Sequence, residues 1–543
     1  MLEHSLLSEA VFHQQAASGH AVLLTLPQVL ARLSAEEDLT FTHLRPHQRP
    51  AWHAFLVQLA WLALENDDEP VQLPTGADAW AAKLRALTPG FTDDAPWCLL
   101  NTNWQQPAFL QAPCSKGREA DFNKAAHCAQ DIDLLVTSRH HDEKAGKAPI
   151  TDEALDSLVY ALVTLQGWAS FMGAGNYNTM RMNGGFSSRP QFRLAFARGT
   201  GAEFVRDFRA LLAAEDDWRH AAHDIGIGTG RAPHALLWLP LWDTGSLSLA
   251  DVHPLCLEVT RRVRVVRGGD HRLVVRRAGS DAARVATKAQ AGVVADPWIP
   301  VMRDKTTRAL TAQSHTLGYR SLQTLLFDRA KVALPLLAQP SPAERRSAQS
   351  GTLVAQVLLS GDGRTDGLAV REVLLPPKVL IQFAGAPERL AQRAQAFVEQ
   401  ASTASGKVYR SALIQYMDGS DDVGWKNRDF DKATGPWVQR FDQAIDDAFF
   451  SELFASVETV NDDTVALARW AQWLEAAAWA HLALATEALP SRDGQRWFAR
   501  ARAERFMRLA LHKHFAPLHA AVRGSNGADA PIPDAEDKVL DEH

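Results

Sequence analysis

The residue types best suited to chemistry lie in a glycine- and asparagine-rich segment at residues 173–190. Its eighteen residues include four glycines, three asparagines and two arginines. Glycine lets the backbone approach a ligand closely, asparagine donates and accepts hydrogen bonds, and arginine neutralises phosphate. This composition is typical of a loop that reads the minor groove of DNA, and an ordinary flexible loop is the alternative. The residues expected to contact DNA are Gly175, Asn176, Asn178, Arg181, Asn183, Gly184 and Gly185.

A second charged segment, at residues 134–147, contains the doublet His141-Asp142. Metal-dependent phosphohydrolases and nucleases use such doublets, so this class of enzyme is an alternative hypothesis. The sequence contains no HExxH helix, no GxxxxGK[ST] phosphate loop and no GxSxG elbow. Its four cysteines form no CxxC pair. We therefore expect a protein that is not an enzyme and that has no metal site and no cofactor.

Positive charge is concentrated at residues 261–288, where nine Lys and Arg accompany two Asp. Because Arg262 and Arg264 alternate with valines ahead of a Gly-Gly-Asp turn, a hairpin with one basic face is predicted. Such a face either contacts phosphate or is merely solvated. The candidates for phosphate contact are Arg262, Arg264, Arg276 and Lys288.

The composition of the whole chain is that of a folded protein. Its 543 residues are 46% hydrophobic and carry a formal net charge of −6, which excludes global disorder. The negative total is weak evidence against nucleic-acid binding, because affinity for phosphate depends on where the positive charge lies. The sequence has no signal-peptide pattern and no apolar run of about 18 residues, so we expect a cytoplasmic protein without a membrane partner.

The secondary-structure pattern changes near residue 376. Strand and helix signals are mixed before it, and Ala-rich segments with helical periodicity follow it, near 385–403, 435–458, 461–489 and 492–516. The predicted class is α+β. We expect a large mixed α/β domain at 1–375, a four-helix bundle at 376–522 and an acidic, disordered tail at 523–543.

Three motifs, at residues 44–49, 134–144 and 181–190, followed by the Ala-rich helical region, resemble the large-subunit (CasA) family of the type I-E CRISPR surveillance complex, Cascade. The resemblance implies a non-catalytic subunit that assembles with the other Cascade proteins and the 5′ handle of the guide RNA. It also implies recognition of the protospacer-adjacent motif (PAM) in double-stranded target DNA, opening of the duplex by a wedge for R-loop formation, and recruitment of a helicase-nuclease. A purely structural scaffold subunit is a further alternative.

The resemblance also implies roles for particular positions. It places the PAM loop at about Gly175 to Gly185 and the wedge in the turn 360–367. The wedge candidates are Gly363, Arg364, Thr365 and Asp366. The candidates in a loop near the guide and the PAM are Ser138, Arg139, His140, Lys144 and Lys147.

Two departures from the family pattern change these expectations. Residues 176–180 replace consecutive glycines, so side-chain readout would replace some backbone contact. The turn 360–367 lacks the family's glutamine, so Arg364 or Thr365 would insert. The basic residue of the minor groove is expected to be an arginine of 261–277 or Lys288.

Overall fold

The structure is a computed structural model that describes most of the chain. Outside its description lie residues 16–19, 68–69, 134–149, 185–188, 269–271, 314–315, 348, 362–363, 386, 419–427, 461, 492–495 and 527–543. Most of the predicted tail at 523–543 falls in the last of these ranges. No helix within the described ranges is long and apolar enough to cross a membrane.

The chain divides into two compact units. The first contains residues 1–317 and 328–380, and the second contains residues 318–327 and 381–543. The second unit includes helix α8 (Tyr319–Phe327), which lies inside the range expected for the first domain. Tyr319 explains this grouping, because its amide donates to Asp446 at 2.6 Å and its ring lies 4.8 Å from that of Phe449.

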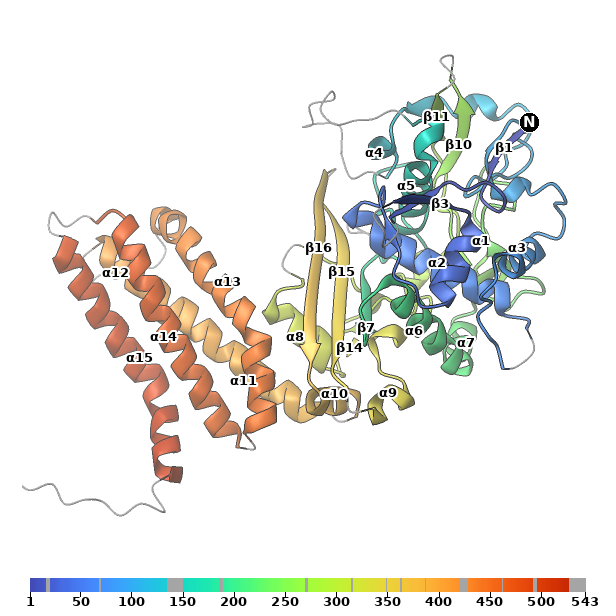
Figure 1. The fold of residues 1–543 in the computed structure, drawn as a ribbon. Helices are drawn as coiled ribbons and strands as arrows, with labels where there is room; N and C mark the ends of the chain where they lie inside the picture. Colours follow the sequence, from blue (N-terminus) through green and yellow to red (C-terminus); the bar gives the residue numbers. More distant parts are fainter. Residues whose placement is uncertain are drawn as a thin grey trace, which may run out of the picture. The chain divides into compact units, whose positions relative to one another are not determined.

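The first unit is mixed α/β and contains several small sheets (Figure 1). Its three-stranded sheets have the orders β16-β15-β7, β10-β11-β6, β3-β2-β4 and β13-β12-β14, and β1-β5 and β8-β9 form pairs. The strands are β1 (Leu2–Ser5), β2 (Phe12–Gln15), β3 (Ala21–Leu24), β4 (Thr40–Phe41), β5 (Cys98–Asn101), β6 (Lys124–Ala126), β7 (Gln191–Ala195), β8 (His234–Leu236), β9 (Val252–Leu257), β10 (Arg262–Arg267), β11 (Leu273–Ala278), β12 (Val301–Arg303), β13 (Thr307–Ala309), β14 (Val332–Ala333), β15 (Gly351–Gly361) and β16 (Arg364–Leu375).

Helices α2 and α5 of this unit are buried over most of their length. Helix α2 is buried almost all round, which is expected of a helix that is hydrophobic on every side. Within it, Trp52 stacks on Phe55 with ring centroids 5.6 Å apart. The helices of this unit are α1 (Leu26–Ser34), α2 (Arg49–Leu64), α3 (Ala77–Ala86), α4 (Ala129–Ile132), α5 (Leu155–Trp168), α6 (Thr200–Ala213), α7 (Glu215–Asp224) and α9 (Pro342–Arg346), and α10 (Pro377–Ala384) spans the boundary.

The second unit is a run of long helices. Together with the mixed α/β first unit, it confirms the predicted α+β class. They are α11 (Glu388–Ser402), α12 (Ser411–Asp418), α13 (Arg428–Thr459), α14 (Asp463–Ala488) and α15 (Arg496–Asn526). A π-helical segment, Thr403–Arg410, joins α11 to α12. Phe397 of α11 stacks on Trp470 of α14 at 5.1 Å, and Asp462 caps α14 by accepting from the amide of Thr464 at 2.7 Å.

Candidate nucleic-acid interface

The glycine- and asparagine-rich loop connects α5 to β7 and has a defined backbone over its described residues, 173–184. Gly173, Gly175 and Gly184 have φ angles of 94°, 80° and 75°, which side chains other than glycine rarely adopt. The amide of Asn176 donates to the carbonyl of Gly173 at 3.0 Å, and that of Met182 donates to the carbonyl of Thr179 at 3.3 Å. The loop is therefore a series of tight turns.

Arg181 lies beneath this loop, in its anchor. Its side chain is 1% exposed and pairs with the carboxylates of Glu258 and Asp296, the latter at 2.8 Å. It also donates to the carbonyl oxygens of residues 254 and 256. Burial opposes the charge of Arg181, but the two carboxylates outweigh this effect and raise the pKa of the guanidinium. The expectation that Arg181 contacts DNA is thus corrected, because in this structure its charge is neutralised inside the protein.

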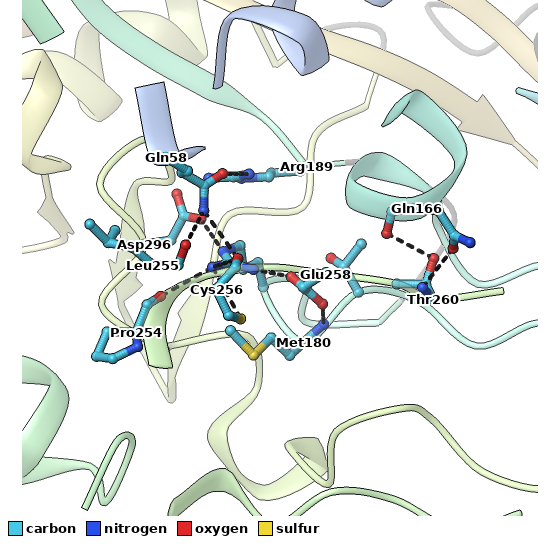
Figure 2. Close-up of polar contacts among 12 residues, drawn as sticks. Gln58, Gln166, Met180, Arg189, Pro254, Leu255, Cys256, Glu258, Thr260 and Asp296 are labelled. Carbon is cyan, nitrogen blue, oxygen red and sulfur yellow. Dashed lines mark hydrogen bonds and ion pairs between the residues drawn. The ribbon is translucent and has the colours of Figure 1, made fainter. Parts of the chain in front are cut away.

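A second buried arginine, Arg189, anchors the other end of the loop. Its guanidinium lies 2.5 Å from Asp296, donates to Gln58 at 3.4 Å and lies 4.8 Å from the ring of Trp298. Burial lowers the pKa of Arg189 to about 10. Figure 2 shows Arg189 beside Gln58, and Glu258 accepting from the backbone of Met180 at 2.9 Å. Asp296 therefore binds both arginines that flank Asn183 and Gly184.

The three asparagines of the loop have different surroundings. Asn178 donates to the carbonyls of Thr179 at 3.1 Å and Met182 at 2.9 Å, so its amide maintains the shape of the loop. Asn176 and Asn183 are half-buried. Asn183 lies between the two anchors in the chain.

A turn that contains Lys288 packs against the same loop. It begins with a short 3₁₀ segment, Lys288–Gln290, and Gly292 has a φ of 79°. A Cβ atom on Gly292 would lie 2.6 Å from the carbonyl carbon of Met182 and 2.7 Å from the nitrogen of Asn183, so only glycine fits there. Lys288 is exposed at the start of this turn. The sequence left the basic residue open between an arginine of 261–277 and Lys288, and the structure has Lys288 exposed on the turn whose Gly292 contacts the loop.

The predicted basic hairpin is present, but its face is not the expected one. Strands β10 and β11 pair with Arg264 opposite Arg276. Arg262 and Arg264 are only 4% and 1% exposed. Arg264 donates to three carbonyl oxygens of residues 101–106, each at 3.0 Å, and Arg262 pairs with Asp121 at 3.1 Å.

This burial corrects the expectation of a solvent-facing row of arginines. Three backbone carbonyl groups of residues 101–106 accept hydrogen bonds from the guanidinium of Arg264, and the sequence gives no sign of that pairing. Burial lowers the pKa of Arg264 to about 10. Of the four phosphate candidates, Arg276 and Lys288 are exposed.

The turn expected to hold the wedge is the tip of the long β15–β16 hairpin. Arg364 pairs with Gly361 and Thr365 with Ser360, whereas Gly363 lies outside the described residues and the side chains of residues 364–366 are not described. Strand β7 runs antiparallel to β15, with Gln191 opposite Gln356. The four residues from 357 to 360 extend the hairpin beyond Gln356 by about 13 Å at roughly 3.3 Å per residue.

The hairpin thus reaches beyond Gln191, the first residue of β7, and the glycine-rich loop leads directly into that residue. The tip of the hairpin and the loop therefore lie at the same end of the β16-β15-β7 sheet (Figure 1). The two segments are about 180 residues apart in the sequence, and the strand register brings them to the same end of this sheet.

Several predicted site residues lie outside the described part of the chain. They are Ser138, Arg139, His140, Lys144 and Lys147 of the guide-proximal loop, Gly185 of the PAM loop, and the alternative catalytic pair His141 and Asp142.

One group that sequence reasoning missed could hold a metal ion, and it consists of His13, His43 and Asp156. The Nδ1 atoms of His13 and His43 lie 3.3 and 2.9 Å from the carboxylate of Asp156. The three residues come from β2, from the segment after β4 and from α5, so no spacing pattern in the sequence predicts that they meet. Because both imidazoles already donate to Asp156, hydrogen bonding accounts for the group.

A mixed α/β unit followed by a unit of long helices is the fold of a class of CRISPR-associated proteins. Solved structures of Cse1, also called CasA, share this fold. Cse1 from Acidimicrobium ferrooxidans matches with a TM-score of 0.62 at 17% identity, over 95% of this chain and 99% of that chain.

Two further structures agree with this match. The CasA (Cse1) of Thermus thermophilus gives a TM-score of 0.62 at 15% identity, over 94% of this chain and 100% of that chain. The Cse1 of Thermobifida fusca gives 0.59 at 16% identity, over 95% and 98%. No family model and no curated sequence relative matches the chain. At these identities the comparison shows a common fold.

Proposed function

We propose that this chain is the non-catalytic large subunit of a type I-E Cascade complex and that it reads the PAM of double-stranded DNA through the loop 173–185. The observation that carries the proposal is the Cse1 fold, which extends over 95% of this chain and 99% of the A. ferrooxidans protein. The anchored loop supports it, because its buried arginines hold the backbone while Asn183 and Gly184 lie between them.

Readout would come from the minor groove, where short polar groups test a limited pattern of acceptors and the guanine amino group. Asn183 supplies a donor and an acceptor, and Gly184 lets the backbone come close. Lys288, on the turn packed against Asn183, would enter the groove as the basic residue. The tip of the β15–β16 hairpin would separate the first base pairs, with Arg364 or Thr365 inserting in place of a glutamine.

The proposed partners are the other Cascade proteins, the guide RNA and a helicase-nuclease. An exposed aromatic pair on α15 supports a protein partner for the second unit. Trp497 and Phe498 are 64% and 54% exposed, and their rings lie 4.4 Å apart. Large exposed aromatic side chains are enriched at protein interfaces.

The loop assignment can be tested with a glycine whose conformation an asparagine can keep. Gly184 has a φ of 75° and no atom within 4 Å of an added Cβ, so Gly184→Asn fits the free protein and fills the space that DNA would occupy. Gly245→Asn is the matched control, because Gly245 has a φ of 79° and equally open surroundings.

We expect Gly184→Asn and Asn183→Ala each to weaken PAM-dependent duplex binding by the assembled complex about tenfold, since a groove contact is worth roughly 1–3 kcal/mol. Guide-RNA assembly and the melting temperature should stay unchanged, as for Gly245→Asn. Binding as tight as that of the parent, at matched salt, would show that this loop does not read DNA and would favour the scaffold alternative.

A further inference from the structure

A small cavity behind the loop is lined by an unusual number of cationic side chains. Its volume is about 150 Å³, and its polar lining comes from Lys124, Arg261, Arg262, Arg277 and Asn176. None of the described residues that line it carries a carboxylate. At about 30 Å³ per water molecule, the space equals roughly five waters and admits a phosphate group.

The register of the sheet forces two of these charges together. Strand β6 pairs antiparallel with β11 so that Lys124 stands directly opposite Arg277. Like charges at directly opposed positions of a sheet are destabilising. The Nε of Arg277 is buried and makes no hydrogen bond with the described residues. A donor of this kind is normally satisfied by a ligand or by water.

Arg261 adds a third charge, and no carboxylate among the described residues pairs with it. Its guanidinium donates to the carbonyl oxygens of Ser170, at 2.8 Å, and of Tyr177. Burial, together with the neighbouring Arg277, lowers the pKa of Arg261 to about 9. Asp121 pairs with Arg262, and Asp131 acts on Arg277 from outside the cavity lining. Asp121 thus pairs with one of the four positive charges, and Asp131 offsets part of the burial effect on another.

The cavity is continuous with the proposed reading loop. Asn176 belongs to both, and a Cβ on Gly175 would lie 3.4 Å from the Cα of Gly279 at the cavity wall. The amide of Ser280 donates to the carbonyl of Gly175 at 3.2 Å. A group bound in the cavity would therefore be held at a fixed distance from the loop.

We propose that this cavity binds one backbone phosphate of the target DNA duplex beside the PAM, with Lys124, Arg277 and Asn176 as donors. The inference rests on the proposed function. Phosphate contacts set the register of a protein on DNA without reading sequence. The cavity would thus position the duplex, while Asn183 and Lys288 would discriminate between sequences.

The test is the salt dependence of duplex binding by the assembled complex with Lys124→Gln/Arg277→Gln. Each phosphate contact contributes about 0.9 to the slope of log K against log salt, so we expect the slope to fall by about 0.9. Affinity should fall equally for duplexes with and without the PAM. Arg231→Gln/Lys432→Gln, which removes two exposed charges elsewhere, should leave the slope unchanged.

The outcomes separate this inference from the proposed function. PAM-dependent binding with an unchanged slope would overturn the phosphate site alone, and absence of any PAM dependence in the parent would overturn the proposed function. Loss of guide RNA with an unchanged duplex slope would assign the phosphate to the guide and refute the DNA assignment.

Lys124→Gln alone should raise the melting temperature of the free chain, because it removes a repulsion, and a lower value would contradict the charge argument.

Discussion

The clearest prediction concerns Arg181, which the sequence offered as a DNA contact and the structure places in the interior. Replacing Arg181 with alanine removes the cation that pairs with the buried carboxylates of Glu258 and Asp296. Among the described contacts, Arg189 is then the one cation that still pairs with Asp296. Removing one partner of a buried ion pair destabilises a protein by about 3–5 kcal/mol. We expect Arg181→Ala to lower the free energy of unfolding of the first unit by that amount.

Urea unfolding followed by tryptophan fluorescence measures this change, because Trp168 and Trp298 are buried near Arg189. A second variant separates charge from packing. In Arg181→Met/Glu258→Gln the stranded carboxylate is removed together with the arginine, so a large part of the lost stability should return.

The opposite result would refute the burial argument. If Arg181→Ala unfolds at the same urea concentration as the parent and the complex nevertheless loses PAM-dependent binding, Arg181 reaches DNA and the anchor described above is not its role. If Arg181→Met/Glu258→Gln is no more stable than Arg181→Ala, Glu258 is not the partner that matters.

Three further outcomes are expected. Arg364→Ala/Thr365→Ala should slow R-loop formation more than it weakens the initial capture of PAM-containing duplex, and equal losses in the two assays would place the wedge elsewhere. Trp497→Ala/Phe498→Ala should reduce co-purification of the other complex subunits without lowering the melting temperature, because both rings are exposed; undiminished co-purification would remove α15 from the interface. Elemental analysis of the purified chain should find less than one transition-metal ion per chain, since His13 and His43 already donate to Asp156. A stoichiometric metal that His43→Ala removes would revive the metal-dependent alternative.

Periodicity and composition predicted the elements whose signals are local. The long helices of the second unit follow from Ala-rich, 3.6-residue patterns, and the loop at 173–190 follows from its glycines and asparagines. Both signals arise within a few turns of chain, so no knowledge of the tertiary structure is needed. Helix α8 was missed as part of the second unit because its grouping depends on Asp446 and Phe449, more than 100 residues later.

The roles of individual arginines could not be predicted in this way. Arg181 and Arg264 have the same local sequence character as an exposed arginine, and what buries them is a carboxylate or carbonyl group supplied by a distant segment. Glu258 lies 77 residues from Arg181, and Lys124 meets Arg277 only through strand pairing. Charge counting along the chain therefore located the basic region but could not say which side chains remain free.

Asp296 pairs with Arg181 and Arg189 at once, so one carboxylate joins two positions that lie eight residues apart in the chain. Neither Asn183 nor Gly184 takes part in this pairing. A side chain at these two positions can therefore change without removing the ion pairs of Asp296. Under the proposed function, subunits that read different DNA motifs would differ at Asn183 and Gly184, and an exchange of these two residues would be the smallest change that alters specificity.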